Sequence, residues 1–362
     1  MTRKMKARLL MAGLGIALLA YLFFINRPIP LAFIEIFRLK TASIYNTSKV
    51  IHNEMEAAPF NLNGLHYLVS VRDKIKSDEN GFLFFDANHK KIGFFPTESI
   101  LPSSLAVGEG VFVTASDYSK GNSESHISLF QFNKGMSSPP LKKNIISSTK
   151  TKFFNTSLTY DEKRNNYVLA YEIDEPGLLP FSIRFLTSKD LKTWEQIDYT
   201  FHPDEYAACP TIRVIDGVYY LWYLEKLKYS RVFVTKIARS HDLTNWQTSR
   251  ITFLSSTKEE GINASDFDYI NIGGKSHIFY ATSDQLTDGY ANIKYTAIDF
   301  EIDKVVGEFF DANPESALGK LGIETRHSLD LVSFVAADAF SAGIKFLPSE
   351  GSLERYWKLL AK

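Results

Sequence analysis

The segments TSKDLKTWEQ (Thr187–Gln196) and RSHDLTNWQT (Arg239–Thr248) both read Ser-x-Asp-Leu-x-x-Trp. Their aspartates, Asp190 and Asp242, lie 52 positions apart. Self-similarity at a fixed spacing is the sequence signature of a repeat architecture. The two heptapeptides therefore mark equivalent places in two copies of one structural unit.

Stretches with a strand, a tight turn and a second strand occur upstream of both heptapeptides and elsewhere in the chain. The hairpin turns carry Gly, Asn or Asp, as in Asp216-Gly217, and the strand runs are rich in Val, Ile, Tyr and Phe. The five candidate copies are Ala58–Asp73, Ser103–Ser119, Asn155–Glu172, Ala208–Glu225 and Asn263–Gln285. Five repeated units of about four strands predict an all-β fold, a five-bladed β-propeller.

We expect each Ser-x-Asp-Leu-x-x-Trp segment to follow the third strand of a blade. The Ser and Asp side chains would accept hydrogen bonds from the backbone N–H groups of the turn. The Leu and Trp side chains would fill the gap between neighbouring blades. The alternative is that Trp194 or Trp246 stacks on a sugar.

The N-terminus carries the charge-free apolar run Leu9–Ile25, preceded by four basic residues. At about 1.5 Å per residue, 17 residues span roughly 26 Å, near the short limit for a bilayer helix. The positive-inside rule then predicts a single-pass signal-anchor with a cytoplasmic N-terminus and a propeller in the periplasm, the lumen or the extracellular space. We expect residues 1–30 to be this transmembrane anchor, 31–57 a linker and 58–362 the propeller, with 311–362 hardest to read. A cleaved signal peptide is the alternative.

Composition excludes several classes of function. Lys plus Arg equals Asp plus Glu at 41 each, so no net field attracts nucleic acid. The single cysteine, Cys209, excludes an internal disulfide framework and a multi-thiolate metal site. There is no P-loop, dinucleotide fingerprint or zinc motif. We expect no cofactor and no metal.

The repeated heptapeptide and the hairpin PTIRVIDGVYYLWY (Pro210–Tyr223) resemble the five-bladed propeller superfamily of glycoside hydrolase families 32, 43, 62 and 68. The resemblance covers roughly residues 58–310. It implies a funnel at one end of the central channel, where three carboxylates act as nucleophile or base, as stabiliser and as general acid. It also implies a carbohydrate, an oligo- or polysaccharide, as the partner.

The sequence departs from this family where the catalytic carboxylates are expected. The family's acid precedes Pro, as in Glu-Cys-Pro, whereas this chain has Ala208-Cys209-Pro210. The stabiliser of family 32 lies in Arg-Asp-Pro, whereas the comparable stretch here is Asn155-Thr156-Ser157. The first blades contain no convincing Asn-Asp-Pro nucleophile. The family's triad therefore cannot be carried over.

Other carboxylates could replace it. Asp266 and Asp268, two apart on a predicted inner strand, should share one face and point to the channel. Alternatively, one caps a turn and the other is solvated. Glu172, Asp174 and Glu225 end second strands, where they could reach the funnel mouth or form surface ion pairs.

Glu205 lies three residues before the vacant acid position and could reach in from a loop. Arg213 could hold a carboxylate or phosphate, or form an ion pair between blades. Asn155 and Asn263 recur as Asn-x-Ser and suit either blade structure or sugar binding. Asp284 is a further polar candidate after a second strand.

The sequence thus supports three functions. The first is hydrolysis or transglycosylation of an extracytoplasmic polysaccharide by carboxylates drawn from Asp266, Asp268, Glu172, Glu205 and Glu225. The second is a non-catalytic carbohydrate-binding propeller that lost its acid, which the alanine at position 208 favours. The third is an interaction scaffold in an envelope complex.

Overall fold

The computed structural model describes residues 40–43, 47–52, 56–71, 80–108, 110–117, 124–133, 139–179, 181–202, 204–227, 233–255, 263–283, 291–321 and 324–327. The chain divides into two compact units. One comprises Lys40–Lys226 and Phe233–Arg326. It holds the five sheets described below. The other comprises Met1–Leu39, Leu227–Val232 and His327–Lys362.

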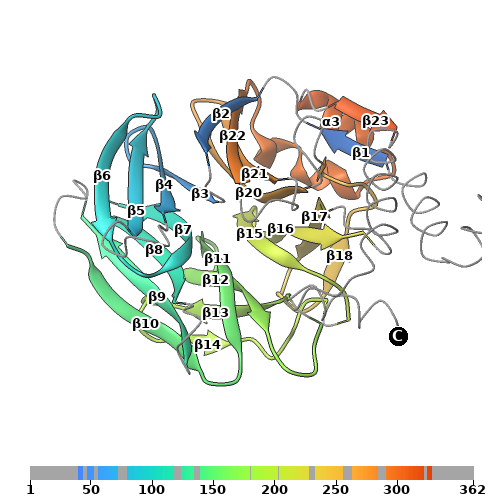
Figure 1. Cartoon of the computed structure of the whole chain (residues 1–362). Coiled ribbons are helices and arrows are strands. Elements are labelled where there is room, and N and C mark those ends of the chain that lie inside the picture. The colour runs from blue at the N-terminus through green and yellow to red at the C-terminus, as the bar shows by residue number, and fades with distance from the viewer. Residues whose placement is uncertain are drawn as a thin grey trace, which may run out of the picture. The chain divides into compact units, whose positions relative to one another are not determined.

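The first unit is built from five antiparallel sheets that surround a central axis (Figure 1). The first sheet has β3 (Ala57–Asn61), β4 (Leu65–Val71), β5 (Gly81–Asp86) and β6 (Lys91–Pro96). The second has β7 (Ile100–Val107), β8 (Gly110–Asp117), β9 (Ser125–Phe132) and β10 (Leu141–Ser148). The third has β11 (Lys152–Asp161), β12 (Asn166–Asp174), β13 (Ser182–Ser188) and β14 (Glu195–Gln196).

The fourth and fifth sheets complete the ring. The fourth has β15 (Ala208–Ile215), β16 (Val218–Lys226), β17 (Phe233–Ser240) and β18 (Trp246–Thr248), with β19 (Leu254–Ser255) also paired to β17. The fifth has β20 (Asn263–Ile272), β21 (Lys275–Ser283), β22 (Ala291–Ile298) and β2 (Ser48–His52). The predicted all-β, five-bladed propeller is therefore confirmed, and all five candidate copies fall in separate blades.

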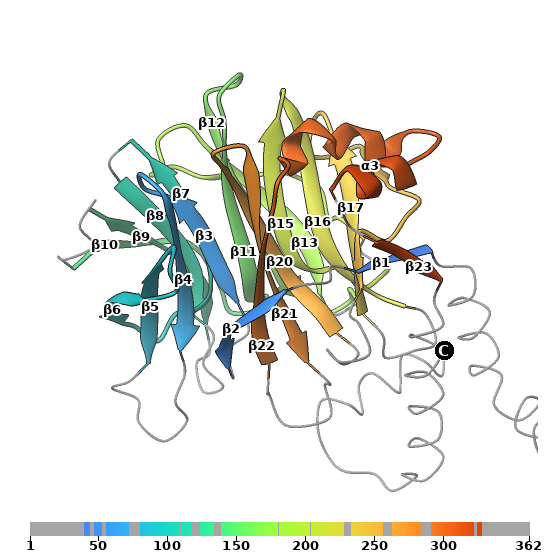
Figure 2. The ribbon, with the colours of Figure 1, turned by 90° about the horizontal axis from the view of Figure 1, so that it is seen from above.

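The first strand of each sheet lies innermost, so β3, β7, β11, β15 and β20 contact one another around the axis. Figure 2 shows these strands from the side. Hydroxyl groups link neighbouring inner strands: Ser104 Oγ donates to the carbonyl of Ala58 at 3.1 Å, and Ser157 Oγ accepts from the N–H of Ile212 at 2.9 Å. Because each such hydroxyl satisfies a buried backbone group of the next blade, the inner strands are held at fixed relative heights.

The ring is closed by a strand from the N-terminal side of the chain. Strand β2 pairs antiparallel with β22 as the outer strand of the fifth sheet. It lies within residues 31–57, which the sequence analysis treated as a linker outside the propeller. The sequence around β2 does not predict this pairing, because the strand is short and its partner β22 is more than 200 residues away in the chain.

The segment after the fifth blade packs on the fourth and fifth blades. It contains η2 (Ile302–Lys304), η3 (Val306–Phe310) and α3 (Glu315–Lys320). Its buried residues, including Phe309 and Leu318, share a core cluster with Trp222. Beyond it, β23 (Glu324–His327) pairs with β1 (Lys40–Ser43).

Both Ser-x-Asp-Leu-x-x-Trp segments follow third strands, as predicted. In each, the aspartate Oδ1 accepts hydrogen bonds from the N–H groups two and three residues further on, at 2.7 and 2.8 Å for Asp190 and 2.9 and 2.7 Å for Asp242. Leu243 is buried in a cluster with residues of the third blade. The ring of Trp246 stacks on Phe185 of that blade at 5.3 Å. The motif therefore holds two blades together.

The expected membrane anchor falls on residues 1–30, which lie outside the described part of the chain. Within the described part, no helix has the length and apolar character that crossing a membrane requires.

Candidate functional site

Four of the five inner strands contain a β-bulge near their beginning. The register shifts lie between Ile100 and Ser103, Phe153 and Thr156, Ala208 and Thr211, and Ser265 and Asp268. Three residues inside these bulges adopt positive φ: Leu101 at 58°, Cys209 at 48° and Asp266 at 52°. A bulge bends its strand and redirects a side chain. The same distortion thus recurs at one end of the channel.

Three carboxyl groups from three blades meet at this end. They belong to Glu56 immediately before β3, Glu172 near the end of β12, and Asp266 inside the bulge of β20. The Asn155 side-chain amide donates to the Glu56 carboxyl group and, at 2.9 Å, to Oδ1 of Asp266. Glu172 accepts the backbone N–H of Cys209 at 2.7 Å. Glu56 and Glu172 are 7% and 3% exposed, so the chain has removed carboxyl groups from water.

Burial changes the protonation of all three groups. It raises the pKa of Glu172 to about 8, although the hydrogen bond from Cys209 opposes this rise. Burial and the Asp266 carboxylate raise the pKa of Glu56 well above its ordinary value. Burial also raises the pKa of Asp266, while hydrogen bonds from Ser265, Cys209, Glu56 and Asn155 oppose the rise. Near neutral pH the carboxyl group of Glu172 therefore favours its protonated form, and the hydrogen bonds to Asp266 favour its ionised form against the effect of burial.

The carboxyl group of Glu172 lies beside position 208, where the sequence has alanine in place of the family's acid. Ala208 is fully buried at the start of β15, and the next residue, Cys209, donates its N–H to Glu172. A carboxyl group from β12 of the third blade thus reaches the strand of the fourth blade that has none at position 208. Burial also raises the pKa of the Cys209 thiol, which favours its neutral form.

The two predicted asparagines have different roles. Asn155 lies inside the bulge of β11, whereas Asn263 precedes the bulge of β20, so they are not equivalent. Asn263 Nδ2 donates to Ser265 Oγ at 3.0 Å, and Ser265 donates to Asp266 at 2.5 Å. Asn263 Oδ1 is buried and has no hydrogen-bond partner among the described residues.

Their spacing predicted that Asp266 and Asp268 share one face, and this prediction is wrong. The bulge between Ser265 and Asp268 breaks the strand period of two. Asp268 instead forms an ion pair with Arg213 of the neighbouring blade. Arg213 also donates to the carbonyl of Tyr269 at 3.0 Å. Burial raises the pKa of Asp268 to about 6, and the charge of Arg213 opposes the rise. The alternative given for Arg213, an ion pair between blades, is the one observed.

The remaining candidates lie outside the hydrogen-bonded carboxyl cluster. The Glu205 side chain is 65% exposed and lies 2.9 Å from Nδ1 of His202. Glu225 is near Lys236 and Glu205, and burial raises its pKa. Asp174 ends β12, and its charge acts on Glu172 from a distance. Asp284 lies outside the described residues.

Sequence reasoning missed Glu56. It was placed in the linker, because the search for a nucleophile in the first blades looked for Asn-Asp-Pro. The available signal was an acid directly before the inner strand Ala57–Asn61, which contains Pro59. An acid at the start of an inner strand lies at the same end of the channel as the bulges of the other four inner strands.

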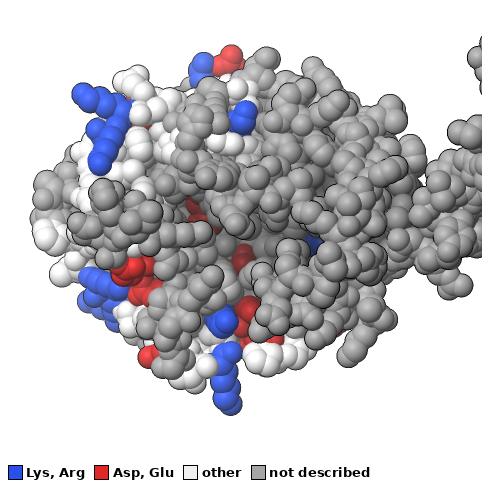
Figure 3. All heavy atoms as spheres, in the orientation of Figure 1, with Lys and Arg blue, Asp and Glu red and all other residues white. Residues whose placement is uncertain are grey.

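Acidic side chains are visible at the centre of this face when the propeller is viewed along its axis (Figure 3). Among the residues that the structure describes, no group of three or more His, Cys, Asp or Glu is arranged as ligands for a metal ion. The described groups can hold and release protons and can accept hydrogen bonds from hydroxyl groups.

No family model matches the sequence, and no curated protein matches it. Solved structures do match the fold. A protein described as a glycoside hydrolase has a TM-score of 0.53 at 15% identity, over 75% of this chain and 94% of that one. An endo-arabinase from Bacteroides thetaiotaomicron has a TM-score of 0.53 at 16% identity, over 70% and 98%. The β-xylosidase RS223 has a TM-score of 0.52 at 10% identity, over 71% and 96%.

These likenesses cover nearly the whole of each matched chain and 70–75% of this chain. At such low identity they concern the fold, not the chemistry. The chain has the five-bladed β-propeller fold of the furanosidase-like glycoside hydrolases, which confirms the structural part of the resemblance seen in its sequence.

Proposed function

We propose that this protein is a carbohydrate-active propeller that hydrolyses a glycosidic bond in an oligo- or polysaccharide. The observation that carries the proposal is the meeting of three carboxyl groups, Glu56, Glu172 and Asp266, at one end of the propeller axis. Glycoside hydrolysis needs one carboxyl group that keeps its proton and one that does not. Burial favours the proton on Glu172, whereas the hydrogen bonds to Asp266 favour its ionised form.

Glu172 is the proposed general acid. Its pKa of about 8 keeps it protonated at neutral pH, and its position beside Cys209 supplies the acid that Ala208 does not. In the proposed step, Glu172 donates its proton to the glycosidic oxygen as the bond to the anomeric carbon breaks. The leaving sugar departs as an alcohol. Water then forms the new bond to the anomeric carbon as a hydroxyl group, and its remaining proton restores the carboxyl group of Glu172.

Asp266 is the proposed anion facing the oxocarbenium-like centre. The Asn155 amide and the Ser265 hydroxyl hold its two oxygens, so its orientation is fixed before substrate binds. Glu56 accepts a hydrogen bond from the same Asn155 amide, and its own hydrogen bond to Asp266 lowers the pKa of Asp266. We assign Glu56 to tuning the pKa of Asp266.

The test measures sugar release by the full-length chain from debranched arabinan and from 4-nitrophenyl α-L-arabinofuranoside and β-D-xylopyranoside. These substrates follow the names of the matched structures, an endo-arabinase and a β-xylosidase. Loss of an acid or base is expected to lower the rate by about 10²–10⁴-fold in Glu172→Gln and Asp266→Asn. The matched control is Glu175→Gln, because Glu175 lies three residues from Glu172 but pairs with Arg184.

The two leaving groups distinguish an acid from a merely structural residue. 4-Nitrophenolate leaves without protonation, so Glu172→Gln should lose much more activity on arabinan than on the nitrophenyl glycoside. Equal losses on both substrates would contradict the role of Glu172 as acid. Full activity of both variants would contradict the proposed site.

The second candidate function is carbohydrate binding without catalysis. It is favoured by Ala208, which stands where the resembling families carry their acid. Binding of arabinan by the wild-type chain, retained in Glu172→Gln and without sugar release, would support it over hydrolysis.

We further propose that the apolar run Leu9–Ile25 anchors the chain in a membrane and that the propeller acts outside the cytoplasm. The basic residues before this run support the orientation. Protease digestion of intact cells tests it: an exposed propeller is cleaved without lysis, whereas a cytoplasmic one is protected.

A further inference from the structure

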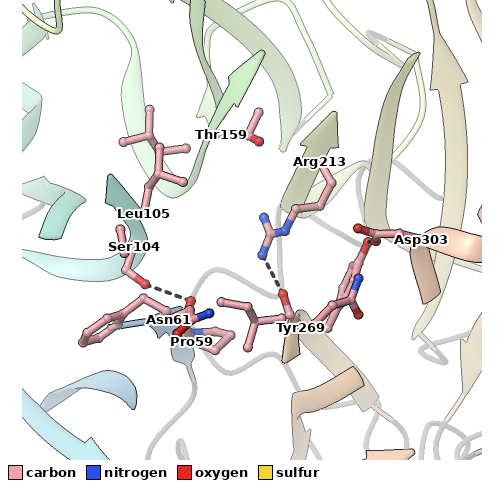
Figure 4. Close-up of a pocket in the computed structure, with 13 residues that line it drawn as sticks. Pro59, Asn61, Ser104, Leu105, Thr159, Arg213, Tyr269 and Asp303 are labelled. Atoms are coloured by element: carbon pink, nitrogen blue, oxygen red, sulfur yellow. Dashed lines mark hydrogen bonds between the residues drawn. The ribbon is translucent and has the colours of Figure 1, made fainter. Parts of the chain in front are cut away.

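A pocket of about 260 Å³ lies among the five inner strands, toward the ends of the strands that are opposite to the carboxyl cluster. Every blade contributes to its lining. The polar residues that line it are Asn61, Ser104, Thr159, Arg213, Asn271 and Asp303. Figure 4 shows Asn61, Ser104, Thr159, Arg213 and Asp303 arranged around one open space.

This pocket is separate from the carboxyl cluster. Asn61 is the last residue of β3 and Asn271 the second-last of β20, whereas Glu56 and Asp266 lie at the beginnings of those strands. Arg213 follows Cys209 by four residues, which is about 13 Å along an extended strand. None of the three clustered carboxyl residues lines the pocket.

Several polar groups in the lining are left with unused hydrogen-bonding capacity. The amide oxygens of Asn61 and Asn271 accept hydrogen bonds from Gly64 N–H at 3.0 Å and Ser276 Oγ at 2.5 Å. Their NH₂ groups make no hydrogen bond to any described residue, and the same holds for the hydroxyl of Thr159. These are three donors that a bound molecule can engage.

The lining also offers one acceptor of high strength. Asp303 Oδ1 accepts the hydroxyl of Tyr269 at 2.6 Å, which orients the carboxylate and leaves Oδ2 without a partner among the described residues. A carboxylate oxygen is the strongest acceptor for a ligand hydroxyl group. The pocket therefore combines donors with one acceptor.

The charges around the pocket disfavour ionic ligands. The guanidinium of Arg213 is already neutralised by Asp268, so an anion would meet the unpaired charge of Asp303. A cation would find a single free carboxylate oxygen opposed by three N–H or O–H donors. A neutral molecule with several hydroxyl groups can satisfy both the donors and the acceptor, because each hydroxyl donates and accepts.

The size and apolar lining limit this molecule further. Small-molecule sites usually measure about 300–1,000 Å³, so 260 Å³ suits one sugar ring rather than a chain. The aromatic rings in the lining, Phe60 and Tyr269, are each 1% exposed and cannot form a stacking platform. Polar contacts would have to supply most of the affinity.

We propose that the pocket at the far ends of the inner strands binds one neutral monosaccharide-sized polyol. Asp303 and the amides of Asn61 and Asn271 would contact its hydroxyl groups, with Thr159 on the opposite wall. This site is independent of the carboxyl cluster and of whether that cluster hydrolyses anything. Ligands held by few polar contacts bind weakly, so we expect millimolar affinity.

The test is a saturation-transfer NMR titration of the full-length chain with D-xylose, L-arabinose and D-galactose, and with acetate and sulfate as anionic probes. Two near-isosteric variants remove contacts: Asp303→Asn and Thr159→Val. The expected weakening of sugar binding is about tenfold for Asp303→Asn and about threefold for Thr159→Val. Glu175→Gln is the control and is expected to leave this binding unchanged, because Glu175 pairs with Arg184 and does not line the pocket.

Opposite outcomes would overturn the proposal. These are no saturation transfer to any of the three sugars, binding of the anions instead, or sugar binding lost in Glu172→Gln and retained in Asp303→Asn. A near-ultraviolet circular dichroism spectrum shows whether each variant is folded, and if one is not, the other decides.

Discussion

Replacing Glu172 by glutamine should change how the stability of the propeller depends on pH. The glutamine keeps an oxygen that can accept the hydrogen bond from the N–H of Cys209, but its side chain cannot ionise. The wild-type carboxyl group has a pKa of about 8 in the folded chain against an ordinary value of 4.5. The folded state therefore holds a proton that the unfolded state releases between these two values.

The sign and size of this change in stability follow from the linkage between proton binding and folding. A carboxyl group with a raised folded pKa contributes its full stability below pH 4.5 and loses it as the pH rises to about 8. A difference of this size corresponds to at most about 5 kcal/mol, because one pKa unit is about 1.4 kcal/mol. Between pH 5 and pH 8, a window of three pH units, the wild-type chain should lose at most about 4 kcal/mol of unfolding free energy relative to Glu172→Gln.

Urea unfolding followed by tryptophan fluorescence at pH 5 and pH 8 measures this difference. Comparing the two chains cancels the contributions of the carboxyl groups that do not interact with Glu172. The control, Glu175→Gln, removes a group whose pKa is lowered by hydrogen bonds from Arg184 and Thr151, so its effect should be the same at both pH values. An equal stability gap between wild type and Glu172→Gln at pH 5 and pH 8 would refute the reasoning.

Three further predictions concern the blades and the site. Arg213→Met should destabilise the chain by about 3–5 kcal/mol because it leaves the Asp268 carboxylate buried without its partner, and the double variant with Asp268→Leu should recover part of this loss, both measured by urea unfolding. Leu243→Ala should cost about 2–5 kcal/mol, since the side chain is 3% exposed between two blades; a change within the error of the melting curve would contradict the interpretation of the heptapeptide. Asn155→Leu should abolish activity while the chain stays folded, because it removes the amide shared by Glu56 and Asp266; activity within twofold of wild type would separate Asn155 from the site.

The fold was predictable because its signals are local and repeated. The heptapeptide occurs in two blades 52 residues apart, and hairpin turns such as Asp216-Gly217 and runs of Val, Ile, Tyr and Phe recur from blade to blade. The closing strand β2 was not, because its partner lies at the other end of the chain and five residues carry too little pattern. Pairing over such a separation depends on the closed ring, not on local sequence.

The candidate site was predictable only in part. Glu172 was found at the end of a predicted second strand, Asp266 on a predicted inner strand and Asn155 from a recurring Asn-x-Ser. The structure brings these three residues together. The prediction that Asp266 and Asp268 share one face was wrong, because a bulge with positive φ at Asp266 interrupts the strand period. A bulge without glycine cannot be recognised in the sequence. Glu56 was missed because it lies before the first recognised repeat. Both errors concern where the backbone departs from the regular pattern.

The central claim is that burial at the propeller axis keeps Glu172 protonated at neutral pH beside an anionic partner. Carbon-13 NMR of the side-chain carboxyl groups, titrated from pH 4 to pH 9 with Glu172→Gln to assign the signal, tests it most directly. The account predicts that the Glu172 resonance titrates near pH 8. Titration of that resonance near pH 4.5 in the folded chain would contradict it.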